Sequence, residues 1–355
     1  MARMALLAVL ALALTPMLSW ALDIRLVRQW AVKYNVSSVL VFGDSSVDPG
    51  NNNYLSTTVK GDFLPYGKDF FDGRPTGRFS NGRLATDLIA AALGHTKTIP
   101  AFLDRNLKPT DLLHGVSFAS AASGYDDLTA NLSKVMPVSK QLDYFRHYKM
   151  RVIKLVGAKK AAEIIRDAIV VLSMGTNDFI QNYFLEPIRP KQFTLEEYMN
   201  YLISRMSNNI MVMHSLGLTR LAVVGVPPLG CMPIVRTLMG EGKCVKKLNL
   251  YSSLFNSKIQ KELATLKTTL GMKSSYVDAY GIILDAVNHP QRYGLTVTSK
   301  GCCGTGTIEY GPTCKGMRTC ADASKYVFFD AVHPTQKMYQ IIAVEAIKSI
   351  DKSLA

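Results

Sequence analysis

Short apolar runs alternate along the chain with longer stretches in which apolar residues recur every three or four positions. The runs are rich in Val, Ile, Leu or Tyr and are bounded by Gly, Pro, Asn or Asp, as is typical of fully buried parallel strands. We therefore predict four short strands, at residues 38–42, 168–173, 221–225 and 275–278.

The stretches with helical periodicity predict four helices, at residues 84–93, 195–216, 245–270 and 337–350. The first follows the cap-like pair Ser80-Asn81. The second begins after Thr194, and Glu197 stands at the spacing of a capping box. Strands that alternate with helices predict right-handed crossover connections and a parallel sheet with helices on both faces.

In parallel sheets of this kind, ligands bind at the carboxyl ends of the strands, where the loops gather. Ser45 follows the first predicted strand, in a segment rich in Gly, Asn and Pro (residues 43–53). The chain of 355 residues contains no low-complexity linker, like-charge block or repeat. We therefore expect residues 22–355 to form one α/β domain with its chemistry at this edge of the sheet.

The first 21 residues have the build of a signal peptide. Arg3 precedes the uncharged stretch 5–14. Ser19-Trp20-Ala21 has the small-x-small pattern of a cleavage site, with small residues at its first and third positions. The apolar stretch is shorter than the roughly 20 residues that a membrane-spanning helix needs. We therefore expect residues 1–21 to be removed and the mature chain to be secreted without a transmembrane segment; an uncleaved anchor is the alternative.

All six cysteines lie in the C-terminal half of the chain, and an even number in a secreted protein predicts disulfides. Cys231 and Cys244 flank one loop and are expected to pair, which leaves four cysteines to close residues 302–320. Zinc is the rival interpretation, but there is no Cys-x-x-Cys motif and no His at ligand spacing, so we expect no metal ion. Asn35 and Asn131 begin glycosylation sequons.

The formal net charge is +14 at pH 7, and the basic residues are scattered, in runs no longer than pairs such as Lys159-Lys160. A protein that binds nucleic acid usually gathers such residues on one face or helix, so we expect no nucleic-acid partner. For a secreted chain, the charge favours attraction to an anionic polysaccharide or membrane surface.

Four short segments supply the groups that acyl transfer needs. Ser45 follows the first strand, Gly124 ends a run of small residues, and Asn177 follows the second strand. Asp330 and His333 stand three residues apart before the last helix. A serine hydroxyl becomes nucleophilic when an imidazole takes its proton, and a carboxylate orients that imidazole. A backbone N–H at Gly124 and the amide of Asn177 can stabilise the oxyanion of the intermediate.

Together these segments resemble the plant GDSL esterase/lipase family, a branch of the SGNH hydrolases, which are named for Ser, Gly, Asn and His in four blocks. The likeness extends to residues 48–53, 66–70, 73–83 and 226–231, and so covers nearly all of the mature chain. It implies a flavodoxin-like three-layer α/β/α fold with a central parallel sheet, secretion to the cell wall or apoplast, and no cofactor.

Residue by residue, the resemblance implies that Ser45 is the nucleophile and that Asp330 and His333 complete a catalytic triad. The backbone N–H of Ser45, Gly124 and Asn177 would form the oxyanion hole.

Ser46 stands where the family name has Leu, so two neighbouring hydroxyls compete for the role of nucleophile, and the register with Gly43-Asp44 favours Ser45. We expect an enzyme that hydrolyses carboxylic esters, of acyl lipids or acylated cell-wall components, through an acyl-enzyme. Two alternatives stay open: an acyltransferase that uses the same acyl-enzyme, and a secreted binding protein that has lost its activity.

Overall fold

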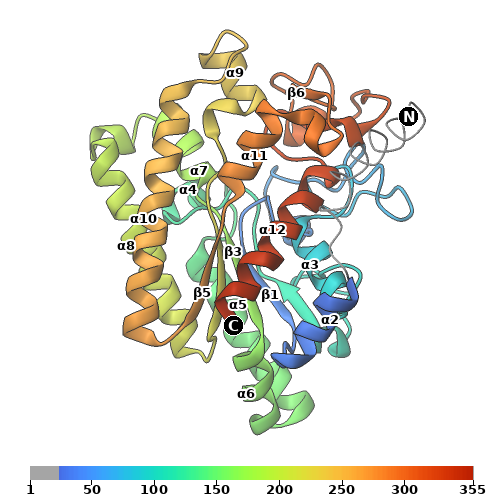
Figure 1. Cartoon of the computed structure of the whole chain (residues 1–355), viewed down its shortest axis with the longest axis vertical. Helices are drawn as coiled ribbons and strands as arrows, with labels where there is room; N and C mark the ends of the chain where they lie inside the picture. The colour runs from blue at the N-terminus through green and yellow to red at the C-terminus, as the bar shows by residue number, and fades with distance from the viewer. Residues whose placement is uncertain (1–23, 355) are drawn as a thin grey trace, which may run out of the picture.

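The structure is a computed structural model that describes residues 24–354, so the predicted signal peptide lies outside the described residues. Its centre is a sheet of five parallel strands in the order β2-β1-β3-β4-β5 (Figure 1). The strands are β1 Val39–Gly43, β2 Gly115–Ser117, β3 Ile169–Ser173, β4 Arg220–Val224 and β5 Lys273–Val277. This is the flavodoxin-like strand order, so the predicted fold class is confirmed.

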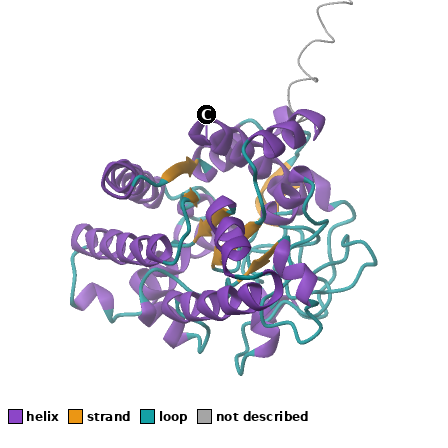
Figure 2. Cartoon of the chain, turned by 90° about the horizontal axis from the view of Figure 1, so that it is seen from below, coloured by secondary structure: helices purple, strands orange, loops and turns teal. Residues whose placement is uncertain are grey.

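Helices cover both faces of the sheet (Figures 1 and 2). One face carries α2 Ile24–Lys33, α3 Ala85–Leu93, α11 Ala279–Asn288 and α12 Gln336–Leu354. The other carries α5 Val138–Val156, α8 Leu195–Ser215 and α10 Lys246–Leu270, and α6 Ala158–Asp167 packs on α5. The remaining short elements are α4 Asp127–Leu132, α7 Thr176–Phe179, α9 Pro233–Met239 and the strand pair β6 Val297–Gly301 with β7 Tyr326–Phe328.

The four predicted strands correspond to β1, β3, β4 and β5, and the four predicted helices to α3, α8, α10 and α12, with ends that differ by a few residues. All residues of β1 and β3 are buried, as their continuous apolar runs predict. The predicted capping box of α8 is confirmed: Thr194 Oγ1 accepts the Glu197 N–H at 3.3 Å, and the Glu197 carboxylate accepts the Thr194 N–H at 2.8 Å.

Neither β2 nor α5 was predicted from the sequence. β2 has only three residues, one of them Gly, which is too short for a periodic pattern to appear. On α5, the buried residues Leu142, Phe145, Tyr148 and Val152 do recur at steps of three and four. Charged residues stand between these apolar positions, so the segment looks polar overall. Its helical character appears only when the spacing of the apolar residues is examined.

The pair Ser80-Asn81 does not cap α3, which corrects the prediction. The first turn of α3 is closed by Asp87, whose carboxylate accepts the Leu84 N–H at 2.8 Å. Asn81 Oδ1 instead accepts the N–H of Gln336 at 2.9 Å. Asn81 therefore caps α12, a partner far along the chain that local sequence does not reveal.

All six cysteines are paired, so the prediction of disulfides is confirmed. The bonds are Cys231–Cys244, as expected, and Cys302–Cys320 and Cys303–Cys314 within the expected segment. Within residues 24–354, no helix combines the length and the apolar character needed to cross a bilayer. That residues 22–355 form a single domain stays a prediction, although one cluster of buried apolar side chains runs from Val27 to Ile350.

Candidate active site

Ser45 lies in the turn that follows β1, at the carboxyl edge of the sheet. The turn begins at Gly43, where φ is 151° and an added Cβ would stand 2.1 Å from the Ser173 carbonyl oxygen. The N–H of Asp44 donates to the same oxygen at 3.0 Å. The close contact with β3 thus requires glycine and holds Ser45 at the end of the sheet, with 9% of its surface exposed.

Short hydrogen bonds join Ser45 to the segment before α12. His333 Nε2 lies 2.9 Å from Ser45 Oγ, and His333 Nδ1 lies 2.7 Å from Asp330 Oδ2. Asp330 Oδ1 accepts the backbone N–H groups of Val332 at 2.8 Å and His333 at 2.6 Å. Both Asp330 and His333 are buried. The structure therefore brings the three predicted triad residues together in one hydrogen-bonded line.

Ser46, the competing hydroxyl, makes different contacts. Its Oγ donates to Asp44 Oδ1 at 2.7 Å and lies 2.8 Å from Ser173 Oγ. The backbone N–H of Ser46 also donates to Asp44 Oδ1, at 2.9 Å. Burial raises the pKa of Asp44 to about 6 in spite of these hydrogen bonds. The imidazole of His333 thus faces Ser45, whereas Ser46 is held by Asp44 and Ser173.

Asn177, a predicted oxyanion donor, lies on α7 and lines the same cavity as Ser45. Its Nδ2 donates to the Ser123 carbonyl oxygen at 2.9 Å, which orients the amide. A primary amide has two N–H groups, so the second remains for a ligand. Within residues 24–354 the backbone N–H of Ser45 donates to no protein acceptor.

Gly124, the other predicted donor, stands next to Ser123 and likewise donates its N–H to no acceptor in the described part of the chain. An added Cβ would stand 2.2 Å from Asp178 Oδ1, so the site requires glycine. Asp178 also accepts the N–H groups of Tyr125 and Asp126, at 2.8 and 3.2 Å, and thereby holds this loop. Burial raises the pKa of Asp178 to about 7. Gly124 does not line the cavity that Ser45 and Asn177 share.

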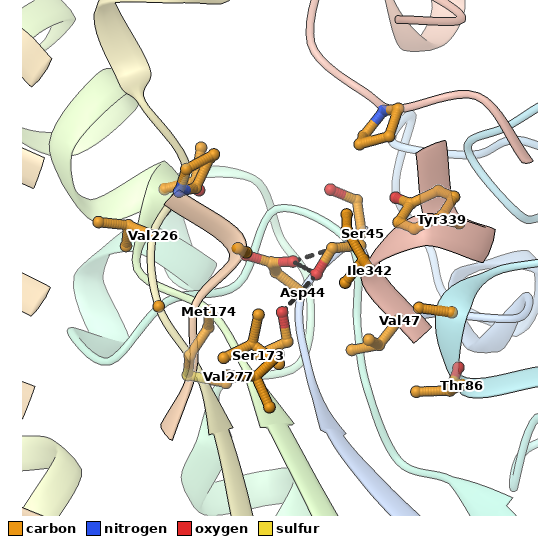
Figure 3. Close-up of a pocket in the computed structure, with 18 of the residues that line it drawn as sticks. Asp44, Ser45, Val47, Thr86, Ser173, Met174, Val226, Val277, Tyr339 and Ile342 are labelled. Atoms are coloured by element: carbon orange, nitrogen blue, oxygen red, sulfur yellow. Dashed lines mark hydrogen bonds between the residues drawn. The ribbon is translucent and has the colours of Figure 1, made fainter. Parts of the chain in front are cut away.

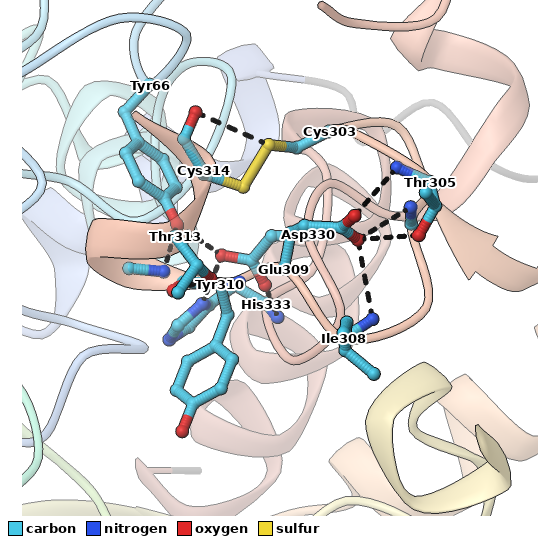
Figure 4. The surroundings of a disulfide bond; sticks show 12 residues. Tyr66, Cys303, Thr305, Ile308, Glu309, Tyr310, Thr313, Cys314, Asp330 and His333 are labelled. Atoms are coloured by element: carbon cyan, nitrogen blue, oxygen red, sulfur yellow. Dashed lines mark hydrogen bonds and ion pairs between the residues drawn. A yellow bond between two sulfur atoms is a disulfide. The ribbon is translucent and has the colours of Figure 1, made fainter. Parts of the chain in front are cut away.

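Tyr66 is a residue that the sequence analysis quoted in a motif but assigned no role. Its hydroxyl donates to Asp330 Oδ2 at 2.6 Å and accepts the Gly311 N–H at 2.7 Å (Figure 4). The ring is fully buried against Phe79 and Phe329. Burial, followed by the charge of Asp330, raises the pKa of Tyr66 well above its usual range, so the hydroxyl stays a donor.

The cavity beside Ser45 is lined mostly by apolar side chains (Figure 3). Tyr339 of α12 is one of the few polar groups, and its hydroxyl is turned toward the side on which Ser45 lies. Tyr339 is 3% exposed, and its hydroxyl has no hydrogen-bond partner within the described residues. Burial and the neighbouring carboxylates Asp44 and Asp330 raise the pKa of Tyr339 well above its usual range.

Two other predictions concern the surface and metal binding. Asn35 and Asn131 are both exposed, and their glycosylation stays a prediction. Among residues 24–354, no group of three or more His, Cys, Asp or Glu side chains is arranged to hold a metal ion.

Comparison with known proteins identifies the family. The GDSL-like lipase/acylhydrolase family matches residues 39–346. The chain belongs to this family. Two relatives of this GDSL protein come from Arabidopsis thaliana. GDSL esterase/lipase At5g45950 is 54% identical over 96% of both chains, and GDSL esterase/lipase APG is 43% identical over 88% of this chain and 90% of its own. Membership of the family supports carboxylic ester hydrolase activity.

Two solved structures align with most of the GDSL chain at low identity. A catalytic mutant of an acetylxylan esterase from Geobacillus stearothermophilus is 13% identical, covers 88% of this chain and 94% of its own, and has a TM-score of 0.42. A lipase from a goat rumen metagenome is 10% identical over 89% and 97%, with a TM-score of 0.38.

Proposed function

We propose that this GDSL protein is a secreted serine esterase/lipase that hydrolyses carboxylic esters through an acyl-enzyme. Ser45 is the nucleophile, His333 the general base and acid, and Asp330 the group that orients the imidazole. The observation that carries this proposal is the 2.9 Å contact between Ser45 Oγ and His333 Nε2, on an imidazole whose Nδ1 is held by a buried carboxylate.

In the first half-reaction, His333 Nε2 takes the proton of Ser45 Oγ as the oxygen attacks the ester carbonyl carbon. The carbonyl oxygen becomes an oxyanion, which the N–H groups of Ser45, Gly124 and Asn177 stabilise. The intermediate collapses, the bond to the alkoxy oxygen breaks, and the proton on His333 passes to the departing alcohol. The acyl group remains on Ser45.

In the second half-reaction, water takes the place of the alcohol. His333 removes one proton from the water as its oxygen attacks the acyl carbon, and a second oxyanion forms in the same hole. Collapse returns the proton to Ser45 Oγ and releases the carboxylic acid. An acyltransferase would follow the same steps with an alcohol in place of water, so this alternative shares the whole site.

The substrate and the place of action are also parts of the proposal. The substrate is the ester of an acyl lipid or of an acylated cell-wall component, met in the cell wall or apoplast. Three disulfides are compatible with an oxidising compartment, and two exposed sequons with passage through the secretory pathway. Attraction to an anionic polysaccharide surface is supported by the net charge, which is +14 for the full chain and +13 without Arg3 of the predicted signal peptide.

Two serine variants test the assignment of the nucleophile. Ser45→Ala should lower kcat on p-nitrophenyl acetate by several orders of magnitude, because the acyl-enzyme can no longer form. Ser46→Ala is the matched control, a neighbouring hydroxyl in the same turn, and should retain most of the activity. The reverse result would assign the nucleophile to Ser46. A folded wild-type protein with no activity on any ester would favour the inactive binding protein instead.

A further inference from the structure

The cavity beside the candidate active site extends far below it. It runs between the sheet and the layer formed by α3, α11 and α12, and its volume is about 100 Å³. The sheet contributes alternate residues, which share one face: Val171 and Ser173 of β3, and Ala222 and Val224 of β4. The stripe that α12 contributes follows steps of three and four along one side of the helix: Tyr339, Ile342, Ala346 and Ile350.

Small side chains create this space. Four alanines line the cavity at positions where larger apolar residues would fill it: Ala85, Ala222, Ala279 and Ala346. Protein interiors are close-packed and contain few voids larger than a water molecule. An elongated cavity next to a candidate nucleophilic serine therefore indicates a binding site for part of the substrate.

The polarity of the lining changes along the cavity. Asp44, Ser45, Ser46 and the Tyr339 hydroxyl lie at the end next to His333, where the strands finish and α12 begins. Thr86 of α3 lies farther from Ser45 (Figure 3), and the rest of the wall is mainly apolar down to Ile350 of α12, which runs toward the opposite edge of the sheet (Figure 1). An ester with a long acyl chain matches this change in polarity. Its oxygens would lie at the polar end and its alkyl chain along the apolar part of the cavity.

We propose that this cavity binds the acyl chain of the substrate and that the substrate acids are unbranched, aliphatic and of medium length. This inference rests on the proposed function. The acyl group stays on Ser45 through both half-reactions, whereas the alcohol must leave before water enters. The deep walls of the cavity are all buried, which suits the acyl group. The mouth, where Asn177 lies, is partly exposed, which suits the alcohol that must leave.

The dimensions set the expected chain length. An engineered cavity of about 150 Å³ admits benzene, so a volume of about 100 Å³ takes roughly four carbons without rearrangement. From Tyr339 to Ile350 the helix rises about 1.5 Å per residue, or roughly 16 Å in all. A chain of single bonds advances about 1.2 Å per bond, so about twelve carbons reach the end. Met174 and Met232 line the cavity and can move aside for the longer chains.

The chain-length profile of the wild-type enzyme is the first measurement. On p-nitrophenyl esters, kcat/KM should rise about fourfold for each methylene buried, from acetate to chains of about four to eight carbons. It should fall for chains longer than about twelve carbons, which pass Ile350. In a second series, alkyl acetates of increasing alcohol length should show no comparable rise. A rise in the alcohol series alone would overturn the acyl assignment.

Two alanines of α12 give a matched pair of variants. Ala346 and Ala343 are both buried, at 4% and 3% exposure, but only Ala346 lines the cavity. Ala346→Leu should lower the octanoate-to-acetate ratio of kcat/KM at least tenfold and leave the unfolding temperature equal or higher, because the added atoms fill a gap. Ala343→Leu should keep the ratio and lower the unfolding temperature by overpacking.

A second pair tests the opposite change if Ala343→Leu fails to fold. Ile350→Ala should move the optimum toward longer acyl chains, whereas Ile347→Ala, an equally buried isoleucine outside the cavity, should leave the optimum in place. If Ala346→Leu and Ile350→Ala both left the profile unchanged while Ser45-dependent acetate hydrolysis persisted, the inference would fail and the proposed function would stand. Loss of activity on all esters in the wild type would overturn the proposed function itself.

Discussion

Each oxygen of the Asp330 carboxylate takes two hydrogen bonds, and Tyr66 is the donor that reaches it from another part of the chain. Tyr66→Phe keeps the buried ring and removes only the hydroxyl. We expect kcat to fall about tenfold or more, since a hydrogen bond to a charged group contributes about 1.5–3 kcal/mol, with little change in KM.

The division of the effect between kcat, KM and stability separates a positioning role of Tyr66 from a merely structural one. If the hydroxyl acts by holding the Asp330 carboxylate, kcat should fall in Tyr66→Phe while KM changes little. A normal kcat together with a lower unfolding temperature would reduce Tyr66 to a packing residue.

At the scale of elements, the Cys303–Cys314 disulfide closes the loop that supports Asp330. The loop holds Gly311, which donates to Tyr66, and Glu309, whose carbonyl oxygen accepts the Ala331 N–H at 2.8 Å (Figure 4). Replacing both cysteines by serine should lower the unfolding temperature and also lower kcat, because the hydrogen bonds that hold Asp330 loosen.

The Cys231–Cys244 bond provides the control, since its sequence separation of 13 residues is close to the 11 of Cys303–Cys314. Loops of this size give about 3 kcal/mol of stabilisation each on the chain-entropy account, so both double variants should lose similar stability. The loop that Cys231 and Cys244 close reaches the triad segment through one backbone hydrogen bond, from the Ile234 N–H to the Ala331 carbonyl oxygen at 3.0 Å, and it gives no hydrogen bond to Tyr66 or to the Asp330 carboxylate. We therefore expect the loss of kcat to be smaller for this double variant. Equal losses of kcat at equal stability would contradict the coupling.

Across the whole fold, burial raises the pKa of four carboxyl groups: Asp127, Asp44 and Asp48, the last two to about 6, and Asp178, to about 7. The folded chain keeps these protons at pH values where the unfolded chain has released them. The stabilisation from these groups should therefore be complete below about pH 4 and decrease as the pH rises to about 7, by up to about 1.4 kcal/mol per proton and pH unit.

Other groups act in the opposite direction and shape the measurement. Burial lowers the pKa of His95, so its contribution to stability increases as the pH rises to about 6.5. Hydrogen bonds from Thr305 and its neighbours outweigh burial and lower the pKa of Glu309 to about 2, so its contribution is lost only below about pH 4.5. The net positive charge also increases in acid and destabilises the fold, and moderate salt screens it. Urea unfolding from pH 5 to 8 should show the decrease, and Asp44→Asn should make it shallower. Stability that rises steadily with pH would contradict the effect.

Local patterns in the sequence predicted much of the fold. Period and bounding residues located four of the five strands of the sheet and four of the long helices, and the alternation of the two predicted the parallel sheet that the structure has. The pairing of Cys231 with Cys244 and the contact of Asp330 with His333 join residues only 13 and three positions apart. Residues so close in sequence remain close in space in most conformations of the chain, so these two contacts were predictable.

Contacts that depend on packing across the fold have no local signature in the sequence. Tyr66 meets Asp330 across 264 residues, and no spacing rule relates two such positions. Asn81 caps α12 rather than the helix beside it because the two segments fold together. Ala222 of β4 and Ala346 of α12 are far apart in sequence, and the fold brings both to the wall of one cavity. Such a gap is a property of the assembled core, and no single segment encodes it.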